Sequence, residues 1–183
     1  METTKTKEMT AEAMHDTAVK QGPITKEYQA NPHEVIDALN RLRSTEITSY
    51  LQYKQHAYMA VSLLAPGLKK EFEAHAEQEL QHADMLAARI QQLGGVPLYS
   101  LHEIATRAEQ AGVQPEQGAK LTDMVMENLL IERKQIEAYT ALVRELSDKD
   151  LITAKLLVTI LEQTEKHASE LADYLKRTAD TRD

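Results

Sequence analysis

Residues 79–82 read Glu-Leu-Gln-His, and residues 164–167 read Thr-Glu-Lys-His. A further glutamate precedes each segment, because Glu46 lies 33 residues before the first (79 − 46) and Glu132 lies 32 residues before the second (164 − 132). The chain therefore carries twice the pattern of a Glu followed by a Glu-x-x-His segment, with Thr164 in place of the last Glu. This duplicated pattern indicates a dinuclear metal site inside a four-helix bundle.

Apolar residues recur at spacings of three and four in four long segments, which predicts four amphipathic helices. These helices should cover about residues 31–64, 68–93 and 119–146, with a fourth that begins after residues 147–150. Only short breaks follow the first and third helices, so each forms an antiparallel pair with its successor. The longer segment 96–118, with a short helical stretch within it, separates the pairs. We therefore expect an all-α four-helix bundle with one long crossover.

The two ends of the chain are expected to lie outside this bundle, which should span residues 31–179. Residues 1–30 are polar, lack sustained periodicity and contain the helix-breaking pair Gly22-Pro23. They are predicted to form a flexible arm, with a possible helical turn around residues 11–19. Residues 180–183 are expected to form a short tail.

Composition excludes several classes of protein. The 183-residue chain has no cysteine, so disulfides and thiolate metal ligands are excluded, and any metal must be held by histidines and carboxylates. The net charge of −8, with nearly balanced charges in residues 1–30, disfavours nucleic acid as a partner. No apolar run is long enough to span a bilayer, and no hydrophobic signal segment precedes the bundle. We expect a cytoplasmic protein with no membrane partner.

The candidate metal ligands are Glu46, Glu79, His82, Glu132 and His167, all on the apolar stripes of the predicted helices. A carboxylate in such a position loses its hydration, which is costly unless a cation or proton compensates. Three carboxylates at one level of a bundle repel one another, whereas a pair of divalent cations would satisfy them all. The sequence therefore predicts that these five residues bind two metal ions.

Other polar residues near these ligands have simpler interpretations. His75 is interpreted as a hydrogen-bonded core residue, and His56 as a surface or interface residue. Tyr53 is expected to be a core aromatic residue, with a supporting or redox role at the metal site as the alternative. Asn128 and Gln135 either donate hydrogen bonds to the ligands or are solvated at the rim of the bundle.

The chain resembles the ferritin-like superfamily from about residue 34 to residue 175, and is most similar to bacterioferritins and bacterioferritin-like, Dps-like mini-ferritins. The resemblance rests on Leu39-Asn40-Arg41-Leu42 leading to Glu46, Tyr53, His56, Glu79-Leu80-Gln81-His82-Ala83-Asp84, Ile131-Glu132-Arg133, Glu137-Ala138-Tyr139 and Glu165-Lys166-His167-Ala168. It implies a ferritin-like bundle and a di-iron ferroxidase centre, at which dioxygen or hydrogen peroxide oxidises Fe(II). It also implies storage of the iron inside a homo-oligomeric cage.

By the same resemblance, Glu46 and His82 would hold one metal, Glu132 and His167 the other, and Glu79 would bridge them. Three departures modify this expectation. Thr164 stands where the family has its second bridging Glu, Leu80 stands where a bacterioferritin has its haem-ligating Met, and eight residues follow Leu175. We therefore expect a weaker Glu132/His167 position, no haem, and a 12-subunit cage, because a 24-subunit ferritin needs a fifth helix.

Thr164 also leaves three alternatives open. The five-ligand set resembles dimanganese catalases, which disproportionate peroxide and have a single bridging Glu. The chain is otherwise a storage or structural shell with a degenerate centre that keeps at most one metal. Finally, Gln163 or Glu165 could replace the missing ligand through a local helix irregularity of the π-bulge type.

Overall fold

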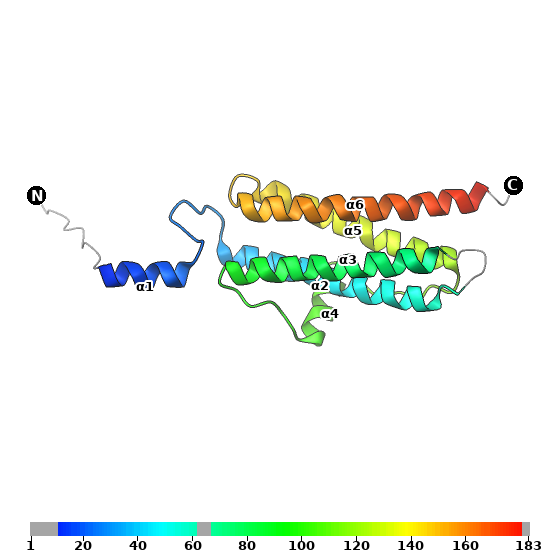
Figure 1. The fold of residues 1–183 in the computed structure, drawn as a ribbon, viewed down its shortest axis with the longest axis horizontal. Helices are drawn as coiled ribbons and strands as arrows, with labels where there is room; N and C mark the ends of the chain where they lie inside the picture. The colour runs from blue at the N-terminus through cyan, green and yellow to red at the C-terminus, as the bar shows by residue number, and fades with distance from the viewer. Residues whose placement is uncertain (1–10, 62–66, 181–183) are drawn as a thin grey trace, which may run out of the picture.

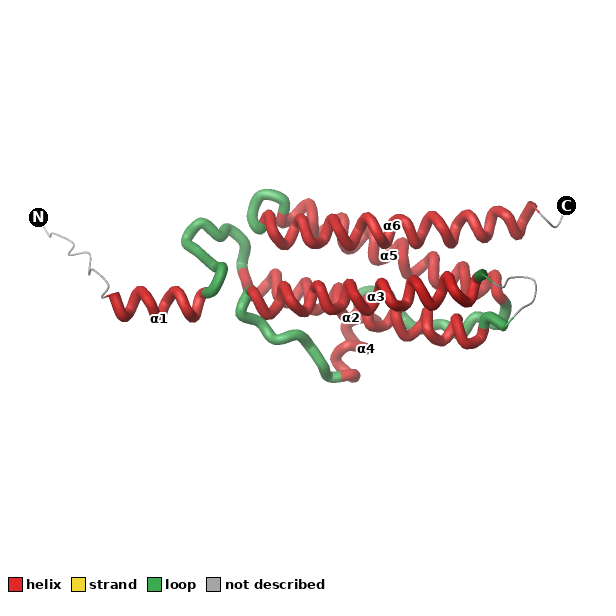
Figure 2. Tube along the Cα trace, viewed as in Figure 1, coloured by secondary structure: helices red, strands yellow, loops and turns green. Residues whose placement is uncertain are grey.

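The computed structural model describes residues 11–61 and 67–180, and in these residues it contains helices and loops without strands (Figures 1 and 2). The helices are α1 (Ala11–Gln21), α2 (Pro32–Met59), α3 (Leu68–Gln92), α4 (Leu101–Gln110), α5 (Leu121–Leu146) and α6 (Leu151–Asp180). Helix α2 packs along α3 and α5 packs along α6, and the two pairs make a four-helix bundle. The predicted all-α bundle with one long crossover is confirmed. None of the described helices is both long and apolar enough to cross a membrane.

Local signals at the helix ends explain where these helices begin and stop. The Asn31 side chain accepts a hydrogen bond from the backbone N–H of His33, and Pro32 occupies the first turn of α2. The Asp150 carboxylate accepts the backbone N–H of Thr153 at 3.0 Å and so caps α6. Beyond α3, Gly94 adopts a φ of 82°, a left-handed conformation that favours glycine at the end of a helix.

One predicted boundary is wrong at residues 60 and 61. Helix α2 was expected to reach Leu64, but it ends at Met59 because the backbone of Ala60 leaves the helical conformation, with a ψ of 64°. The backbone N–H of Val61 then bonds the carbonyl of Met59 at 2.7 Å, which is a tight turn rather than another helical turn. Residues 62–64, which the prediction also placed in this helix, lie outside the described residues.

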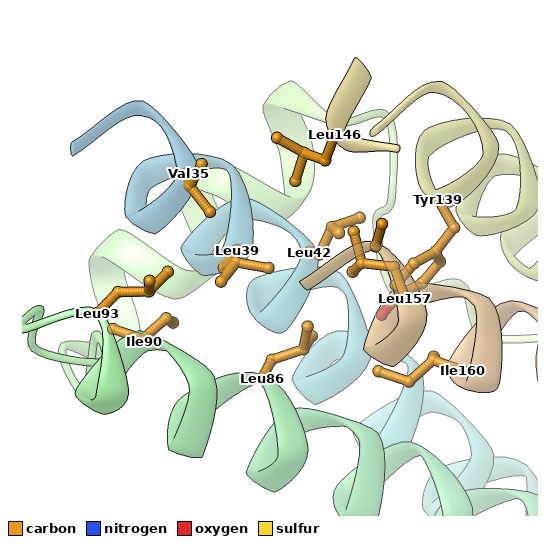
Figure 3. Close-up of a cluster of buried hydrophobic side chains, with 11 residues drawn as sticks. Val35, Leu39, Leu42, Leu86, Ile90, Leu93, Tyr139, Leu146, Leu157 and Ile160 are labelled. Atoms are coloured by element: carbon orange, nitrogen blue, oxygen red, sulfur yellow. The ribbon is translucent and has the colours of Figure 1, made fainter. Parts of the chain in front are cut away.

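The buried apolar residues of the bundle form two main clusters, one toward each end of the helices. The first, drawn in Figure 3, centres on Leu39, Leu86, Ile90, Leu157 and Ile160. The second centres on Phe72, Ala76, Val125 and Leu171. Along α2 and α3 the polar residues of the predicted metal site fall between the stretches that supply these clusters. The site therefore forms a polar layer with apolar packing on both sides, which limits its access to water.

The N-terminal segment contains helix α1, which packs against none of the other helices in the described part of the chain. Residues that follow α1 return to the bundle, where Ile24, Tyr28 and Ala30 pack against the first apolar cluster. The hydroxyl of Tyr28 donates a hydrogen bond to Asp150 at 2.8 Å. Asp150 also forms a buried ion pair with Arg89 of α3, at 3.0 Å. One carboxylate thus joins the N-terminal segment, α3 and α6.

We expect Asp150→Asn to lower the free energy of unfolding by about 2 kcal/mol, because it leaves the buried Arg89 guanidinium without its charged partner. Asparagine keeps an oxygen for the α6 cap, so the loss reports on the ion pair together with the hydrogen bonds that Oδ2 accepts from Tyr28 and Thr153. Urea unfolding followed by circular dichroism measures it. Asp148→Asn, at an exposed position of the same turn, is the matched control. Equal stabilities of the two variants would contradict this role for the ion pair.

Candidate metal centre

The bundle brings the five predicted ligands together in one buried cluster. Glu46 comes from α2, Glu79 and His82 from α3, Glu132 from α5 and His167 from α6. Each is at most 1% exposed. All four long helices therefore contribute, and the helical spacing that placed these residues on apolar stripes also placed them at a common level.

Glu79 lies at the middle of this cluster. Its Oε1 atom is 3.2 Å from Nδ1 of His167 and 3.7 Å from Nδ1 of His82. Toward one side, Nδ1 of His82 lies 3.1 Å from Oε2 of Glu46, and toward the other, Nδ1 of His167 lies 3.3 Å from Oε1 of Glu132. The cluster thus consists of two Glu/His pairs that share a central carboxylate.

Several buried atoms of the cluster have no hydrogen-bond partner. They are Oε1 of Glu79, Oε2 of Glu132 and Nδ1 of His167. Two of them, Oε1 of Glu79 and Nδ1 of His167, face each other at 3.2 Å as an ion pair that lacks hydrogen-bond geometry, and a cation within the cluster would satisfy all three atoms. Carboxylate oxygens and imidazole nitrogens together suit iron, manganese or zinc, so the residues present fit a dinuclear site of this kind.

Two tyrosines hold the outer carboxylates from across the bundle. The hydroxyl of Tyr53 on α2 donates to Glu132 on α5 at 2.5 Å, and that of Tyr139 on α5 donates to Glu46 on α2 at 2.7 Å. Burial and the nearby carboxylates raise the pKa of both phenols well above the ordinary value, so they remain donors. Each tyrosine follows the glutamate of its own helix by seven residues, a spacing visible in the sequence. Tyr53 is a buried core aromatic residue, as expected, and its hydroxyl contacts a candidate ligand.

The two amides near Glu132 have different roles. The side-chain amide of Gln135 donates to Glu46 at 3.0 Å and to Glu79 at 3.3 Å, so the alternative of a solvated rim residue is wrong. Asn128 instead accepts hydrogen bonds from Gln52 and from the His56 ring, and contacts no candidate ligand in this way. Gln135 thus orients the shared carboxylate and one outer carboxylate together.

Two further glutamines, which the sequence interpretation did not assign to this role, contact the imidazoles. Nε2 of His82 lies 2.8 Å from Oε1 of Gln163 on α6, and Nε2 of His167 lies 2.6 Å from Oε1 of Gln78 on α3. Each glutamine immediately precedes the first residue of its own four-residue motif. This repetition is the feature of the sequence that could have indicated a role for the two glutamines.

Thr164 faces the interior without acting as a donor to the cluster. It is 1% exposed, and its hydroxyl donates to the backbone carbonyl of Ile160 at 3.1 Å. Helix α6 is regular α-helix through residues 163–165, so the π-bulge alternative is wrong. Gln163 is directed to His82 and Glu165 is exposed, so neither takes the place of the missing carboxylate.

Two other histidines lie close to the centre. His75 is buried and hydrogen-bonded, as predicted, with Nε2 3.1 Å from Glu170, and its ring stacks on His167 at a centroid distance of 4.0 Å. Nδ1 of His75 has no hydrogen-bond partner, and ligand atoms of His75, Glu132 and His167 all lie within 4.8 Å of one another, so His75 could also contribute to holding a metal. The prediction of a surface or interface position for His56 is wrong, because its side chain is fully buried and the crossover covers it through the carbonyl of Glu116.

Ion pairs compensate the buried charges before any metal binds. Burial alone would lower the histidine pKa values, but the carboxylates of Glu46 and Glu79 raise the pKa of His82 to about 9. In the same way Glu132 and Glu79 raise the pKa of His167 to about 10. Burial and neighbouring carboxylates raise the pKa of Glu79 and of Glu132 to about 7. At neutral pH both imidazoles therefore carry a proton that a metal must displace.

Metal binding should consequently release protons and strengthen as the pH rises. Below the raised pKa values of the histidines, Nδ1 carries a proton, and below about 7 the carboxylates also become protonated. At pH 7 we expect release of about two protons per filled dinuclear site from the imidazoles, plus a fraction from Glu79 and Glu132. Anaerobic titration with Zn(II) in weak buffer measures this. Metal uptake without acidification would contradict it.

The fold and the cluster define a four-helix-bundle protein with a candidate dinuclear carboxylate and histidine centre. Residues 36–180 match the sequence profile of the ferritin family, described as a ferritin-like domain. The chain belongs to the ferritin family.

Individual relatives agree with this assignment. A bacterioferritin of Desulfovibrio desulfuricans is 26% identical over 152 residues, which cover 81% of this chain and 79% of the relative. A dodecameric thioferritin, the bacterioferritin-related protein of Bacteroides fragilis, superposes with a TM-score of 0.78 at 26% identity, covering 93% of this chain and 97% of the other. An archaeal Dps homologue from Halobacterium salinarum gives a TM-score of 0.70 at 28% identity, covering 79% and 80%.

Proposed function

We propose that this protein is a ferroxidase that binds two Fe(II) ions as substrate and oxidises them with dioxygen or hydrogen peroxide. The observation that carries the proposal is the convergence of five buried carboxylate and imidazole side chains from all four long helices, three of whose atoms have no hydrogen-bond partner. In ferritin-like bundles, Glu and Glu-x-x-His sets of this kind hold dinuclear iron or manganese. Membership of the ferritin family favours iron.

We assign the residues of the cluster to metal binding or to orientation of the ligands according to their positions. Glu46 and His82 take one Fe(II), Glu132 and His167 take the other, and Glu79 contacts both. Each Fe(II) gives up one electron, so a pair reduces one hydrogen peroxide to two water molecules, or one dioxygen to hydrogen peroxide, with uptake of two protons in either case. Tyr53, Tyr139 and Gln135 keep the carboxylates oriented, and the apolar clusters on both sides limit the access of water. Electrostatic compensation by three carboxylates favours the higher charge of the oxidised product.

Aerobic addition of Fe(II) to the metal-free protein tests the proposal. Ferric absorbance should appear faster than in buffer. Addition of dioxygen or of hydrogen peroxide, in separate trials, to protein that was loaded with Fe(II) anaerobically should identify the oxidant that is consumed faster. Oxidation no faster than in buffer, by protein whose assembly is intact, would overturn the proposal.

The three-carboxylate centre favours one alternative enzyme and one alternative without enzymatic activity. A dimanganese centre would disproportionate hydrogen peroxide, so the purified protein would contain manganese and release dioxygen, whereas a ferroxidase should release little. A degenerate storage shell would saturate at about one metal per subunit, because Thr164 supplies no ligand. Metal analysis and anaerobic Fe(II) titration separate these cases, since the proposal requires two ions per subunit.

We further propose that the chain assembles as a homo-oligomeric cage of 12 subunits. The support comes from the Bacteroides fragilis relative, which is described as dodecameric and matches 93% of this chain. Most soluble oligomers of identical chains adopt closed symmetry. Sedimentation should give a particle of about twelve times the mass of the chain. Nucleic acid is not expected as a partner at a net charge of −8, and a mobility-shift assay at low salt checks this.

A further inference from the structure

We infer that Gln78 and Gln163 are a reciprocal pair of positioning residues, each of which orients the metal-binding histidine of the opposite motif. This inference rests on the proposed dinuclear site. Gln78 on α3 accepts Nε2–H of His167 on α6 at 2.6 Å, and Gln163 on α6 accepts Nε2–H of His82 on α3 at 2.8 Å. The two contacts cross the interface between the helix pairs in opposite directions.

The nitrogen atom that each glutamine oxygen contacts decides which nitrogen of the ring can bind a metal. An oxygen at Nε2 holds the hydrogen there, so the lone pair that remains for a metal is on Nδ1. Nδ1 is the atom that faces the carboxylates in both histidines, at 3.1 Å from Glu46 for His82 and at 3.2 Å from Glu79 for His167. Each glutamine therefore fixes both the tautomer and the direction of the ring.

The environment of the glutamines suits this role. Both side chains are half-buried at the edge of the polar layer, whereas the rings they contact are at most 1% exposed. An amide is neutral, so it orients the imidazole without adding a fourth negative charge to the centre. The arrangement also accounts for the direction of Gln163, which extends to His82 instead of replacing the ligand missing at Thr164.

A double-mutant cycle on the full-length protein tests the crossed assignment, with anaerobic Co(II) binding as the readout. Variants H82A and H167A each leave one position to measure. In H82A, Q78L should weaken Co(II) binding at the remaining Glu132/His167 position by about 10- to 100-fold, while Q163L should leave it unchanged. In H167A the two glutamine variants should exchange effects. Q78E and Q163E retain an acceptor oxygen and should restore the Co(II) absorption spectrum of the unmodified site, which their added charge alone would not do.

Q81L is the matched control, because Gln81 is exposed on α3. Thermal unfolding of every variant separates loss of fold from loss of orientation, and a shift in the Co(II) absorption spectrum of Q78L and Q163L reports altered ligand geometry. Equal effects of each glutamine on both positions, or coupling to the histidine of its own motif, would overturn the inference. Two tightly bound Co(II) ions without accelerated Fe(II) oxidation would overturn the ferroxidase proposal alone. No Co(II) binding by the unmodified protein would overturn both.

Discussion

Glu79→Gln is expected to lower the rate of protein-dependent Fe(II) oxidation by about 10³-fold, which corresponds to about 4 kcal/mol of activation free energy. Glu79 is the carboxylate within 4 Å of both imidazoles, so its loss removes a ligand from both metal positions at once. Every other candidate ligand is paired with one side. Stopped-flow measurement of ferric absorbance gives the rate, and anaerobic titration should show weaker binding of both ions.

The metal-free variant should remain folded, because glutamine conserves the volume and the buried position. Burial raises the pKa of Glu79 to about 7, so at higher pH the ionised carboxylate opposes folding of the metal-free protein, and the neutral amide removes that cost. We expect an unfolding temperature within about 4 °C of the unmodified protein at pH 8. Glu77→Gln, exposed on the same helix, is the control. Near-normal oxidation by the Glu79→Gln variant would remove the shared carboxylate from the proposed centre.

Thr164→Glu is expected to tighten binding of the second metal by about 100-fold, equivalent to about 2.7 kcal/mol. With three carboxylates, two divalent ions leave a formal charge of +1, whereas a fourth carboxylate reduces it to zero. Thr164 is 1% exposed and lies one helical turn before His167, so the longer side chain starts from the correct face of α6. Anaerobic Fe(II) titration should change from two unequal steps to two similar ones.

The same substitution should destabilise the protein when no metal is present. A larger, charged side chain in a packed position strains the core and adds like charge, at a cost of about 1–3 kcal/mol. The unfolding temperature should therefore fall without metal and rise above that of the unmodified protein with metal bound. Thr164→Gln has the same bulk without the charge and separates the two effects. An equal gain in affinity for this neutral variant would show that charge is not the deficiency.

The sequence predicted the long helices and the five clustered residues because both depend on local spacing. A spacing of three or four residues places Glu79 and His82 on one face of a helix wherever the helix packs, and the repeat in the second half defines the partner face. The end of α2 was less predictable, because its position depends on the backbone of a tight turn at Ala60 rather than on periodicity.

The spacing of residues in the sequence could not predict the contacts between helices that are distant in the chain. His56 was expected at the surface or at an interface because nothing in the local sequence shows that the crossover folds back over it, with the carbonyl of Glu116 3.1 Å from its ring. The roles of Gln78 and Gln163 depend on which residue of another helix lies opposite, and this is set by the packing of α3 against α6. The only indication of these roles in the sequence was the repetition of a Gln immediately before each four-residue motif.

The crossed hydrogen bonds of the tyrosines couple the two halves of the chain. Tyr53 serves Glu132 and Tyr139 serves Glu46, so each half of the duplicated pattern is completed by a phenol from the other half. Replacing the tyrosine of one half therefore removes a hydrogen bond from the carboxylate of the other half. Each half of the candidate centre therefore depends on both halves of the chain, although these are separated by the whole crossover.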